Sequence, residues 1–396
     1  MHHESKKTNK MEPQRVILSK DLQQSLTEAI ACCPHDRLFV LTDNTTLRCC
    51  WPVIKDYPCV DGASIITIPA SDQHKDLESV SHVWQELQRG GATRHSLMMN
   101  LGGGMVTDLG GFAASTFKRG IAFINIPTTL LAMVDASVGG KTGFNFGGLK
   151  NEIGVFNNAS SVILDTTFLQ TLDQENLLSG YAEMLKHALI SNEQMWAEHL
   201  EFLENLDHLE NLDNLENLDI LENLGRLVSD SVAVKQRIVL EDPTEKGLRK
   251  ALNLGHTAGH AFEALALEGG RTDLGSGDGS ADHSRLATTD HQNRPLILHG
   301  YAVAYGLVVE LYLSAIKCGF PTDKMRQTVQ FIKEYYGRMA ISCDDYPHLL
   351  ELMRHDKKNE GDSINFTLLG GIGDIRINQT VSEEDIKEAL DFYREY

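Results

Sequence analysis

The chain has 396 residues, enough for two domains that each bury a core. Its formal net charge of −19 argues against sequence-independent binding to nucleic acid, because phosphates repel an acidic surface. Seven cysteines, without a Cys-x-x-Cys pair, indicate free thiols and no disulfide framework or thiolate zinc site. The first ten residues are polar and no run reaches about 18 apolar residues, so we expect a cytoplasmic protein without a membrane segment.

In the first part of the chain, short apolar runs alternate with helix-like stretches. The runs that read as strands are residues 38–42, 64–68, 96–101, 122–126 and 161–164. Alternation of this kind predicts a parallel sheet covered by helices. We therefore expect an α/β domain over residues 11–175.

From about residue 176 the pattern becomes mostly helical. Helix-like periodicity marks residues 182–190, 227–240, 257–267 and 301–317. Only residues 364–378 depart from it, where glycines between two alternating runs suggest a small hairpin. The sequence thus predicts a second, mostly α-helical domain over residues 176–396.

Two segments of this second domain look like insertions. Residues 204–227 carry a six-residue repeat with Leu at every third position and seven acidic residues between Glu204 and Glu222. A spacing of three drifts around an α-helix, so we expect an acidic, solvated helical elaboration and no coiled coil. Residues 269–295 are rich in Gly, Ser, Asp and Thr without apolar periodicity, which predicts a surface loop.

A glycine-rich turn follows the apolar run that ends at Leu101. Gly102, Gly103 and Gly104 precede a plausible helix that reaches Phe117. A strand, a glycine turn and a helix start present backbone N–H groups to a pyrophosphate, as in a dinucleotide site. The Rossmann spacing is absent, so a nucleotide site and a tight structural turn both remain open.

A second glycine run, Gly139-Gly140-Lys141-Thr142, ends like a phosphate-binding loop of ATPases. The first glycine of that motif is replaced by Asp135, and a helical stretch precedes it, so we do not expect an ATPase. A glycine-flexible loop that presents Lys141, with Lys150 and Asn151 nearby in sequence, suits a phosphate-bearing substrate.

Glutamate and histidine side chains without cysteine form the candidate metal ligands. His256 and His260 lie four residues apart on one predicted helix face, Glu183 and His187 lie on another helix, and His299 opens a third. Such an N/O set suits a catalytic zinc with open positions. Spacing alone does not decide which three bind, nor whether Glu183 simply pairs with Lys186.

Together these segments closely resemble the sugar-phosphate cyclases, and among them the 3-dehydroquinate synthases. The motifs that carry the resemblance are residues 102–108, 117–120, 127–135, 139–143, 150–151, 180–186, 253–260 and 298–300. They occur in order between about residue 37 and about residue 370. The resemblance implies a Rossmann-like nucleotide-binding domain followed by an α-helical metal- and substrate-binding domain.

The family pattern also implies a role for individual residues. Zinc or cobalt would be held by Glu183, His256 and His299. NAD would contact Asp43, Lys75, Gly103, Gly104, Asp108, Thr128, Thr129, Lys150 and Thr171. Asp135, Lys141, Lys186 and His260 would act on the substrate, which Asn151, Lys235, Arg249, Asn253 and one of Lys357 and Lys358 would bind. Arg119 would reach in from a second subunit, which implies a homodimer.

The implied reaction converts 3-deoxy-D-arabino-heptulosonate 7-phosphate to 3-dehydroquinate and phosphate. It runs through transient oxidation by NAD, phosphate elimination, re-reduction and intramolecular aldol closure. Three alternatives remain: a cyclase for another sugar phosphate, a metal-dependent alcohol or glycerol dehydrogenase, and a non-catalytic interaction protein built on the Leu repeat. The cationic residues Lys235, Arg249 and Lys357 favour a substrate that carries a carboxylate.

Overall fold

The computed structural model describes residues 14–147, 149–205, 218–268, 288–289, 295–354 and 364–396. These residues form two compact units. Unit 1 comprises the chain up to Pro127, Ala136–Leu164 and Lys235–Arg249, and unit 2 comprises Thr128–Asp135, Asp165–Val234 and Lys250–Tyr396. The chain therefore passes between the units several times, and the single boundary expected between residues 175 and 176 stays a prediction.

Unit 1 is built on a six-stranded sheet. In sheet order its strands are β1 (Val16–Leu18), β8 (Ser161–Leu164), β5 (Ala122–Pro127), β4 (Leu97–Gly102), β2 (Leu38–Asp43) and β3 (Ser64–Ile68). Every neighbouring pair is parallel. The expected parallel sheet is confirmed; β1, at one edge, was not foreseen from the sequence.

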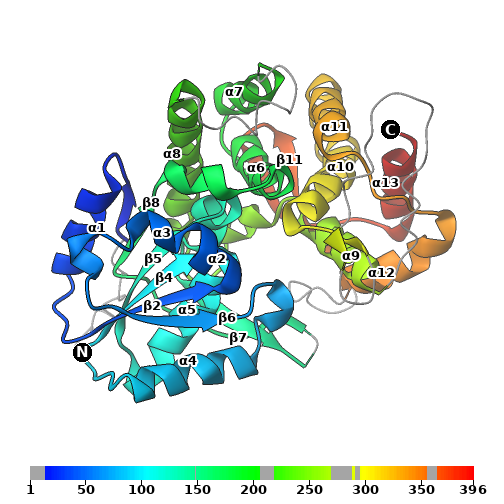
Figure 1. Cartoon of the computed structure of the whole chain (residues 1–396). Coiled ribbons are helices and arrows are strands. Elements are labelled where there is room, and N and C mark those ends of the chain that lie inside the picture. Colours follow the sequence, from blue (N-terminus) through cyan, green and yellow to red (C-terminus); the bar gives the residue numbers. More distant parts are fainter. Residues whose placement is uncertain (1–13, 148, 206–217, 269–287, 290–294, 355–363) are drawn as a thin grey trace, which may run out of the picture. The chain divides into compact units, whose positions relative to one another are not determined.

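Helices cover this sheet as its buried strands require. They are α1 (Leu22–Ala31), α2 (Asn44–Cys49), α3 (Trp51–Ile54), α4 (Leu77–Arg89) and α5 (Gly104–Thr116). All residues of β2 and β4 are buried, as in strands covered on both faces. Helix α5 packs on β4 and β5 and lies beside α4 (Figure 1).

The glycine run before Lys141 leads into an antiparallel hairpin that was not foreseen from the sequence. The hairpin pairs β6 (Lys141–Phe146) with β7 (Leu149–Phe156). A Cβ on Gly143 would lie 2.5 Å from the Ile153 carbonyl oxygen, and a Cβ on Gly154 would lie 2.3 Å from the Thr142 carbonyl oxygen. These two glycines therefore allow the strands to approach closely, which sequence spacing alone does not distinguish from loop flexibility.

Unit 2 is mostly helical, as expected. Its helices are α6 (Gln174–Leu189), α7 (Glu193–Glu204), α9 (His256–Leu267), α10 (His299–Cys318), α11 (Thr322–Tyr336), α12 (Tyr346–Arg354) and α13 (Glu383–Glu395), and α8 (Leu218–Glu241) lies in it as far as Val234. The strands are β9 (Thr288–Thr289), β10 (Pro295–Leu296), β11 (Asn365–Gly371) and β12 (Asp374–Thr380). The antiparallel pairing of β11 with β12 confirms the hairpin expected at residues 364–378.

Helix α10 is the central helix of unit 2 and packs against α6, α9, α11 and α13 (Figure 1). This helix is long and apolar enough to cross a membrane, yet 72% of its most apolar 18-residue stretch is buried inside the protein. Its apolar character is thus explained by burial in the core. Of the two predicted insertions, residues 206–217, 269–287 and 290–294 lie outside the described part of the chain.

Close backbone contacts join α6, α9 and α10. A Cβ on Gly300 would lie 1.8 Å from the Ser179 carbonyl oxygen, and a Cβ on Gly306 would lie 1.9 Å from the Gly255 carbonyl oxygen. Because no side chain fits at these points, the backbones of α6 and α10, and of α10 and the start of α9, come within direct contact. The three helices are therefore held at fixed separations where these glycines lie.

A buried carboxylate completes the start of α9. The residue before this helix, Gly255, has no side chain to cap it, and Glu310 of α10 supplies the missing acceptors. Its two oxygens accept from the backbone N–H groups of Gly255 at 2.6 Å and Ala258 at 3.2 Å. Glu310 itself is fully buried. It therefore acts as an N-terminal cap donated by a neighbouring helix.

We predict that Glu310→Gln lowers the free energy of unfolding by about 2–3 kcal/mol. The amide replaces one of the two acceptor oxygens with an NH₂ group, which faces a backbone donor and leaves it without an acceptor. Urea unfolding measures the difference, with Glu334→Gln on the exposed side of α11 as a control expected within about 0.5 kcal/mol of the unaltered protein. Equal stability of the two variants would contradict the capping role.

Candidate functional site

Three side chains from α6, α9 and α10 converge in unit 2. Glu183 Oε1 lies 3.4 Å from His256 Nε2 and 3.5 Å from His299 Nε2. These ligand atoms all lie within 4.8 Å of one another. The structure thus brings together Glu183, His256 and His299, the same set that the family pattern implied from five candidates.

The electrostatics of this cluster centre on the buried carboxylate of Glu183. Burial raises its pKa, but the Lys186 ammonium, one turn along α6, and the His256 ring outweigh burial and hold the pKa well below its usual range. Burial alone would lower the pKa of His299, but the carboxylates of Glu183 and Glu263 outweigh burial and raise this pKa to about 10. Glu183 is therefore an anion that needs positive charge around it.

The spacing and the donor types fit a tetrahedral divalent ion. Ligands at about 2.1 Å from a tetrahedral zinc stand roughly 3.4 Å apart. The two measured separations from Glu183 Oε1, 3.4 and 3.5 Å, match that edge length. One carboxylate and two imidazoles leave a fourth position open, as in catalytic zinc sites.

Two further groups overlap this cluster. His260, Glu263 and His299 form one, and Asp135, Glu183 and His187 form the other. The His260 ring lies 5.3 Å from the His256 ring and 5.9 Å from the His299 ring, so it borders the cluster. The His187 ring instead bonds Ser231 Oγ through Nδ1 at 2.7 Å in the buried interior.

In unit 1, a buried lysine joins residues predicted for two different ligands. Lys75 Nζ donates to Asp108 Oδ2 at 2.6 Å and to Asn151 Oδ1 at 2.5 Å. Lys75 and Asp108 were expected at NAD and Asn151 at the substrate. The strand β7 residue Asn151 also adopts a left-handed backbone with φ of 50°. A direct contact therefore links the two predicted sets.

The glycine turn opens a helix, as the nucleotide hypothesis requires. Gly103 caps α5 without a side chain, and a Cβ on Gly104 would lie 3.1 Å from Ala136 Cβ. The first turn of α5 therefore has no side-chain cap, as a helix N-terminus that binds an anion requires. Asp43 caps α2, its Oδ1 accepting from the Thr45 and Thr46 backbones.

A loop held by one aspartate positions Arg249. Asp242 Oδ2 accepts from the backbone N–H groups of Gly247 at 2.6 Å and Arg249 at 3.1 Å. The Arg249 guanidinium then donates to the carbonyls of Pro243 and Gly139 and lies over the Phe156 ring. In the same loop, Glu245 accepts from Lys141 Nζ at 2.5 Å.

The other residues predicted for the site each have their own surroundings. Arg119 is exposed in a left-handed backbone conformation with φ of 72°, and Lys235 is buried in α8. Lys150 pairs with Asp72 at 3.4 Å on the surface. Thr129 Oγ1 accepts from Ala132 N and Thr171 Oγ1 donates to Phe168 O, whereas Thr128 is buried and Asn253 ends a 3₁₀ turn. Lys357 and Lys358 lie outside the described residues.

Two glutamates next to the ion cluster were missed from the sequence. Glu263 lies beside His299, and Glu310 caps the helix that carries His256. Glu310 carried a usable signal, because it is the only charged residue between Tyr301 and Ile316. The sequence signal for Glu263 was weaker: this residue lies seven positions after His256, on the same face of the predicted helix.

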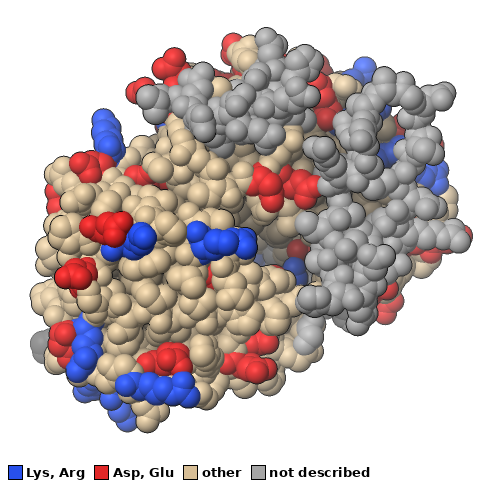
Figure 2. Space-filling model, viewed as in Figure 1, with Lys and Arg blue, Asp and Glu red and all other residues tan. Residues whose placement is uncertain are grey.

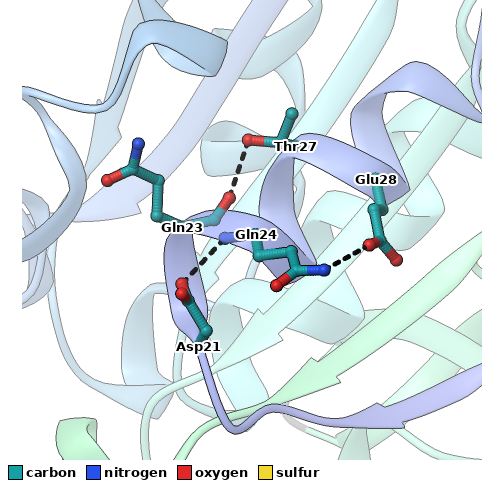
Figure 3. A pocket seen from close by; sticks show the side chains of 5 residues that line it. All are labelled: Asp21, Gln23, Gln24, Thr27 and Glu28. Carbon is teal, nitrogen blue, oxygen red and sulfur yellow. Dashed lines mark hydrogen bonds between the residues drawn. The ribbon is translucent and has the colours of Figure 1, made fainter.

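A hollow on α1, within the described part of the chain, gives no comparable site. Figure 3 shows a hollow on α1 whose lining side chains bond within the helix: Gln24 N–H donates to Asp21, Gln24 Nε2 to Glu28 and Thr27 to the Gln23 carbonyl. On the face drawn in Figure 2, basic and acidic side chains of the described residues are interspersed. No single basic patch dominates that face.

Comparison with known proteins shows the family of the chain. A family model described as 3-dehydroquinate synthase N-terminal matches residues 65–179, and one described as 3-dehydroquinate synthase C-terminal matches residues 180–272 and 287–359. The chain belongs to the 3-dehydroquinate synthase family. It is accordingly an enzyme, as the resemblance had implied. The C-terminal match is interrupted between residues 272 and 287, inside the predicted loop insertion.

Individual relatives agree with the family. The 3-dehydroquinate synthase of Parabacteroides distasonis is 50% identical over 385 residues, which cover 97% of this chain and 99% of that protein. That of Pyrococcus furiosus is 36% identical, covering 90% and 92%. The structure of 2-epi-5-epi-valiolone synthase from Streptomyces hygroscopicus, with NAD⁺ and Zn²⁺ bound, matches with a TM-score of 0.79 and 24% identity over 98% of each chain. This last likeness confirms the two-domain fold.

We predict that the Asp242 loop loses stability in acid. Burial raises the pKa of Asp242, but the N–H groups of Gly247, Lys246 and Arg249 outweigh burial and lower it. A depressed folded pKa adds stability above the ordinary aspartate pKa of about 3.9, and that stability is lost as the pH falls through the folded pKa. The stability difference between the unaltered protein and Asp242→Asn should therefore shrink below about pH 4.

Urea unfolding between pH 3 and pH 8 measures this difference. The exposed Asp61, outside the loop, provides the matched Asp61→Asn control, which we expect to follow the unaltered protein at every pH. A difference between the unaltered protein and Asp242→Asn that stays constant down to pH 3 would show that Asp242 is not an anionic acceptor in this loop.

Proposed function

We propose that this enzyme converts 3-deoxy-D-arabino-heptulosonate 7-phosphate to 3-dehydroquinate and phosphate. The observation that carries the proposal is the buried cluster of Glu183, His256 and His299, spaced for one divalent ion within a chain of this family. A family member at 50% identity over nearly the whole chain bears the same activity in its name. The reaction class is a phosphate-eliminating carbon–oxygen lyase.

The cofactors that fit are NAD and Zn²⁺ or Co²⁺. The similar valiolone synthase contains NAD⁺ and Zn²⁺, and a 2-deoxy-scyllo-inosose synthase that shares the fold contains NAD⁺ and Co²⁺. In this chain Glu183, His256 and His299 would hold the ion, while Lys75, Asp108 and the Gly103–Gly104 turn would hold NAD. When bound, the ion would polarise a substrate hydroxyl and NAD would accept and return hydride at that carbon.

The hairpin of unit 1 supplies the phosphate grip. Lys141 opens β6, and Lys150 and Asn151 stand on β7, so one rigid ribbon carries all three side chains. Lys141 pairs with Glu245 and Lys150 pairs with Asp72, both with substantial exposure of the lysine. Exposed ion pairs are weak, so a phosphate dianion displaces them at little cost.

The carboxylate of the substrate would be held by a second cationic set. The cations Lys235, Arg249 and Lys357 would act here together with the neutral amide of Asn253. The buried Arg249 guanidinium is oriented by two backbone carbonyls and by Phe156, and its planar fork matches the geometry of a carboxylate. A carboxylate-binding arginine favours the heptulosonate phosphate over sugar phosphates that lack this group.

Side chains beside the ion cluster would move protons and hold charge. His260 borders the two ligand histidines, where an imidazole would serve as a general acid–base group. Asp135 lies with Glu183 and His187, where its carboxylate would orient a substrate hydroxyl. Lys186 neutralises Glu183 and keeps this buried anion compatible with folding before an ion arrives.

We also propose a cytoplasmic homodimer. Arg119 is exposed, and both it and Lys118 adopt left-handed backbone conformations at φ of 72° and 49°. Strain of this kind is retained where a side chain must be presented in one direction. Arg119 would reach the phosphate of a substrate in the partner subunit. Seven free thiols suit a reducing compartment.

The deciding experiment incubates metal-replete protein and NAD with the heptulosonate phosphate and follows phosphate, dehydroquinate and NADH. We predict equal amounts of phosphate and dehydroquinate without net NADH, because the hydride is returned within each turnover. Lys141→Ala and His256→Ala should each lower the rate by roughly 10²–10³-fold, through loss of the phosphate grip or of the ion.

His348→Ala provides the matched control for His256→Ala. His348 lies on α12 and pairs with Glu268, away from the ion cluster, so its loss should leave turnover unchanged. Steady accumulation of NADH would instead identify a dehydrogenase. Phosphate release that survives His256→Ala would remove the role of the ion.

A further inference from the structure

The two histidines of the ion cluster present the same nitrogen to Glu183. His256 Nε2 and His299 Nε2 lie 3.4 and 3.5 Å from Glu183 Oε1. For both rings to bind an ion through Nε2 as neutral imidazoles, both must carry their proton on Nδ1. What faces each Nδ1 therefore decides whether the ring is ready to bind.

The Nδ1 of His256 faces a backbone acceptor. It lies 3.1 Å from the Leu254 carbonyl oxygen, two residues earlier in the chain. A carbonyl only accepts, so it selects the tautomer with the proton on Nδ1 and fixes the ring plane. The local backbone thus orients this ligand without help from another element.

The Nδ1 of His299 faces a side chain instead. Glu263 Oε2, on α9, lies 3.6 Å from His299 Nδ1 on the side of the ring opposite Glu183. Glu263 is only 7% exposed, whereas His299 is the first residue of α10, which no side chain caps. Within the described residues, Glu263 is thus placed to do for His299 what the Leu254 carbonyl does for His256.

We propose that Glu263 is a positioning residue for the metal site: it accepts the Nδ1 proton of His299 and so directs Nε2 to the ion. This inference rests on the ion site of the proposed function. The 3.6 Å separation exceeds a formed hydrogen bond, and the contact closes as Nε2 binds. Ligand histidines generally donate their second nitrogen to a carboxylate or carbonyl, and losing that partner weakens metal affinity by about 10- to 100-fold.

The same atoms allow a second role for Glu263. His260, Glu263 and His299 lie close enough to bind an ion themselves. In that arrangement Glu263 would be a ligand, and His299 would use Nδ1 in place of Nε2. The two roles predict different results when Glu263 is replaced, because a ligand sets the coordination of the ion and a positioning residue does not.

The test measures Co²⁺ and Zn²⁺ affinity of the full chain by competition with a chelator, together with the visible absorption of bound Co²⁺. We expect Glu263→Ala to weaken Co²⁺ binding by about 10- to 100-fold, with one ion per chain and an unchanged absorption shape. Glu263→Gln retains an acceptor oxygen and should lose less than about 10-fold. The isosteric glutamine also keeps the test valid if the alanine variant does not fold.

The matched control is Glu268→Ala. Glu268 follows the same helix and also contacts a histidine, His348, on the surface, so we expect unchanged affinity. Unchanged Co²⁺ affinity in Glu263→Ala overturns the inference and leaves the proposed function standing. A changed absorption shape in Glu263→Ala also overturns it and makes Glu263 a ligand. Failure of the unaltered chain to bind Co²⁺ removes the metal site and the inference together.

Discussion

The fully buried carboxylate of Glu183 is the constraint on which unit 2 depends. A buried anion is costly unless cations surround it, and here the compensating groups come from three helices. Lys186 lies one turn along α6, while His256 and His299 open α9 and α10. Because these segments are distant in sequence, the site exists only when the three helices are packed at the right separation.

The separation of the three helices is set by residues whose role cannot be recognised from sequence composition. Gly300 and Gly306 leave no room for a side chain, so α10 touches α6 and the start of α9 through backbone atoms. Glu310 then fixes the first turn of α9. Unit 1 is organised differently, since Lys141 and Lys150 lie in exposed ion pairs with acidic side chains that an anionic ligand can replace. The candidate ion cluster is organised by helix packing, whereas the predicted anion contacts of the hairpin rest on exchangeable ion pairs.

Those parts of the fold that follow from local sequence patterns were predictable. The buried strands of unit 1 and the hairpin after residue 364 follow from apolar runs and alternation. Residue type narrowed the candidate ion ligands to five, and the family resemblance reduced them to Glu183, His256 and His299. Spacing alone could not choose among the five, because the candidates lie on helices that are distant in sequence. Gly139 and Gly140, on which the expected loop before Lys141 rested, lie ahead of β6 with positive φ values. Spacing did not reveal the hairpin that follows, in which Gly143 and Gly154 let the two strands approach closely. Glu263 was missed because its partner lies on another helix.

The two ligand histidines also differ in what their orientation depends on. His256 is oriented by a carbonyl two residues away, so any structure that forms the start of α9 orients it. His299 depends on Glu263, which α9 carries two turns after His256. Helix α9 therefore governs both rings, one through its own first turn and one across the contact with α10. The start of α9 is held by the buried Glu310 and by the Gly306 contact, so a displacement of α9 would change the orientation of both rings together.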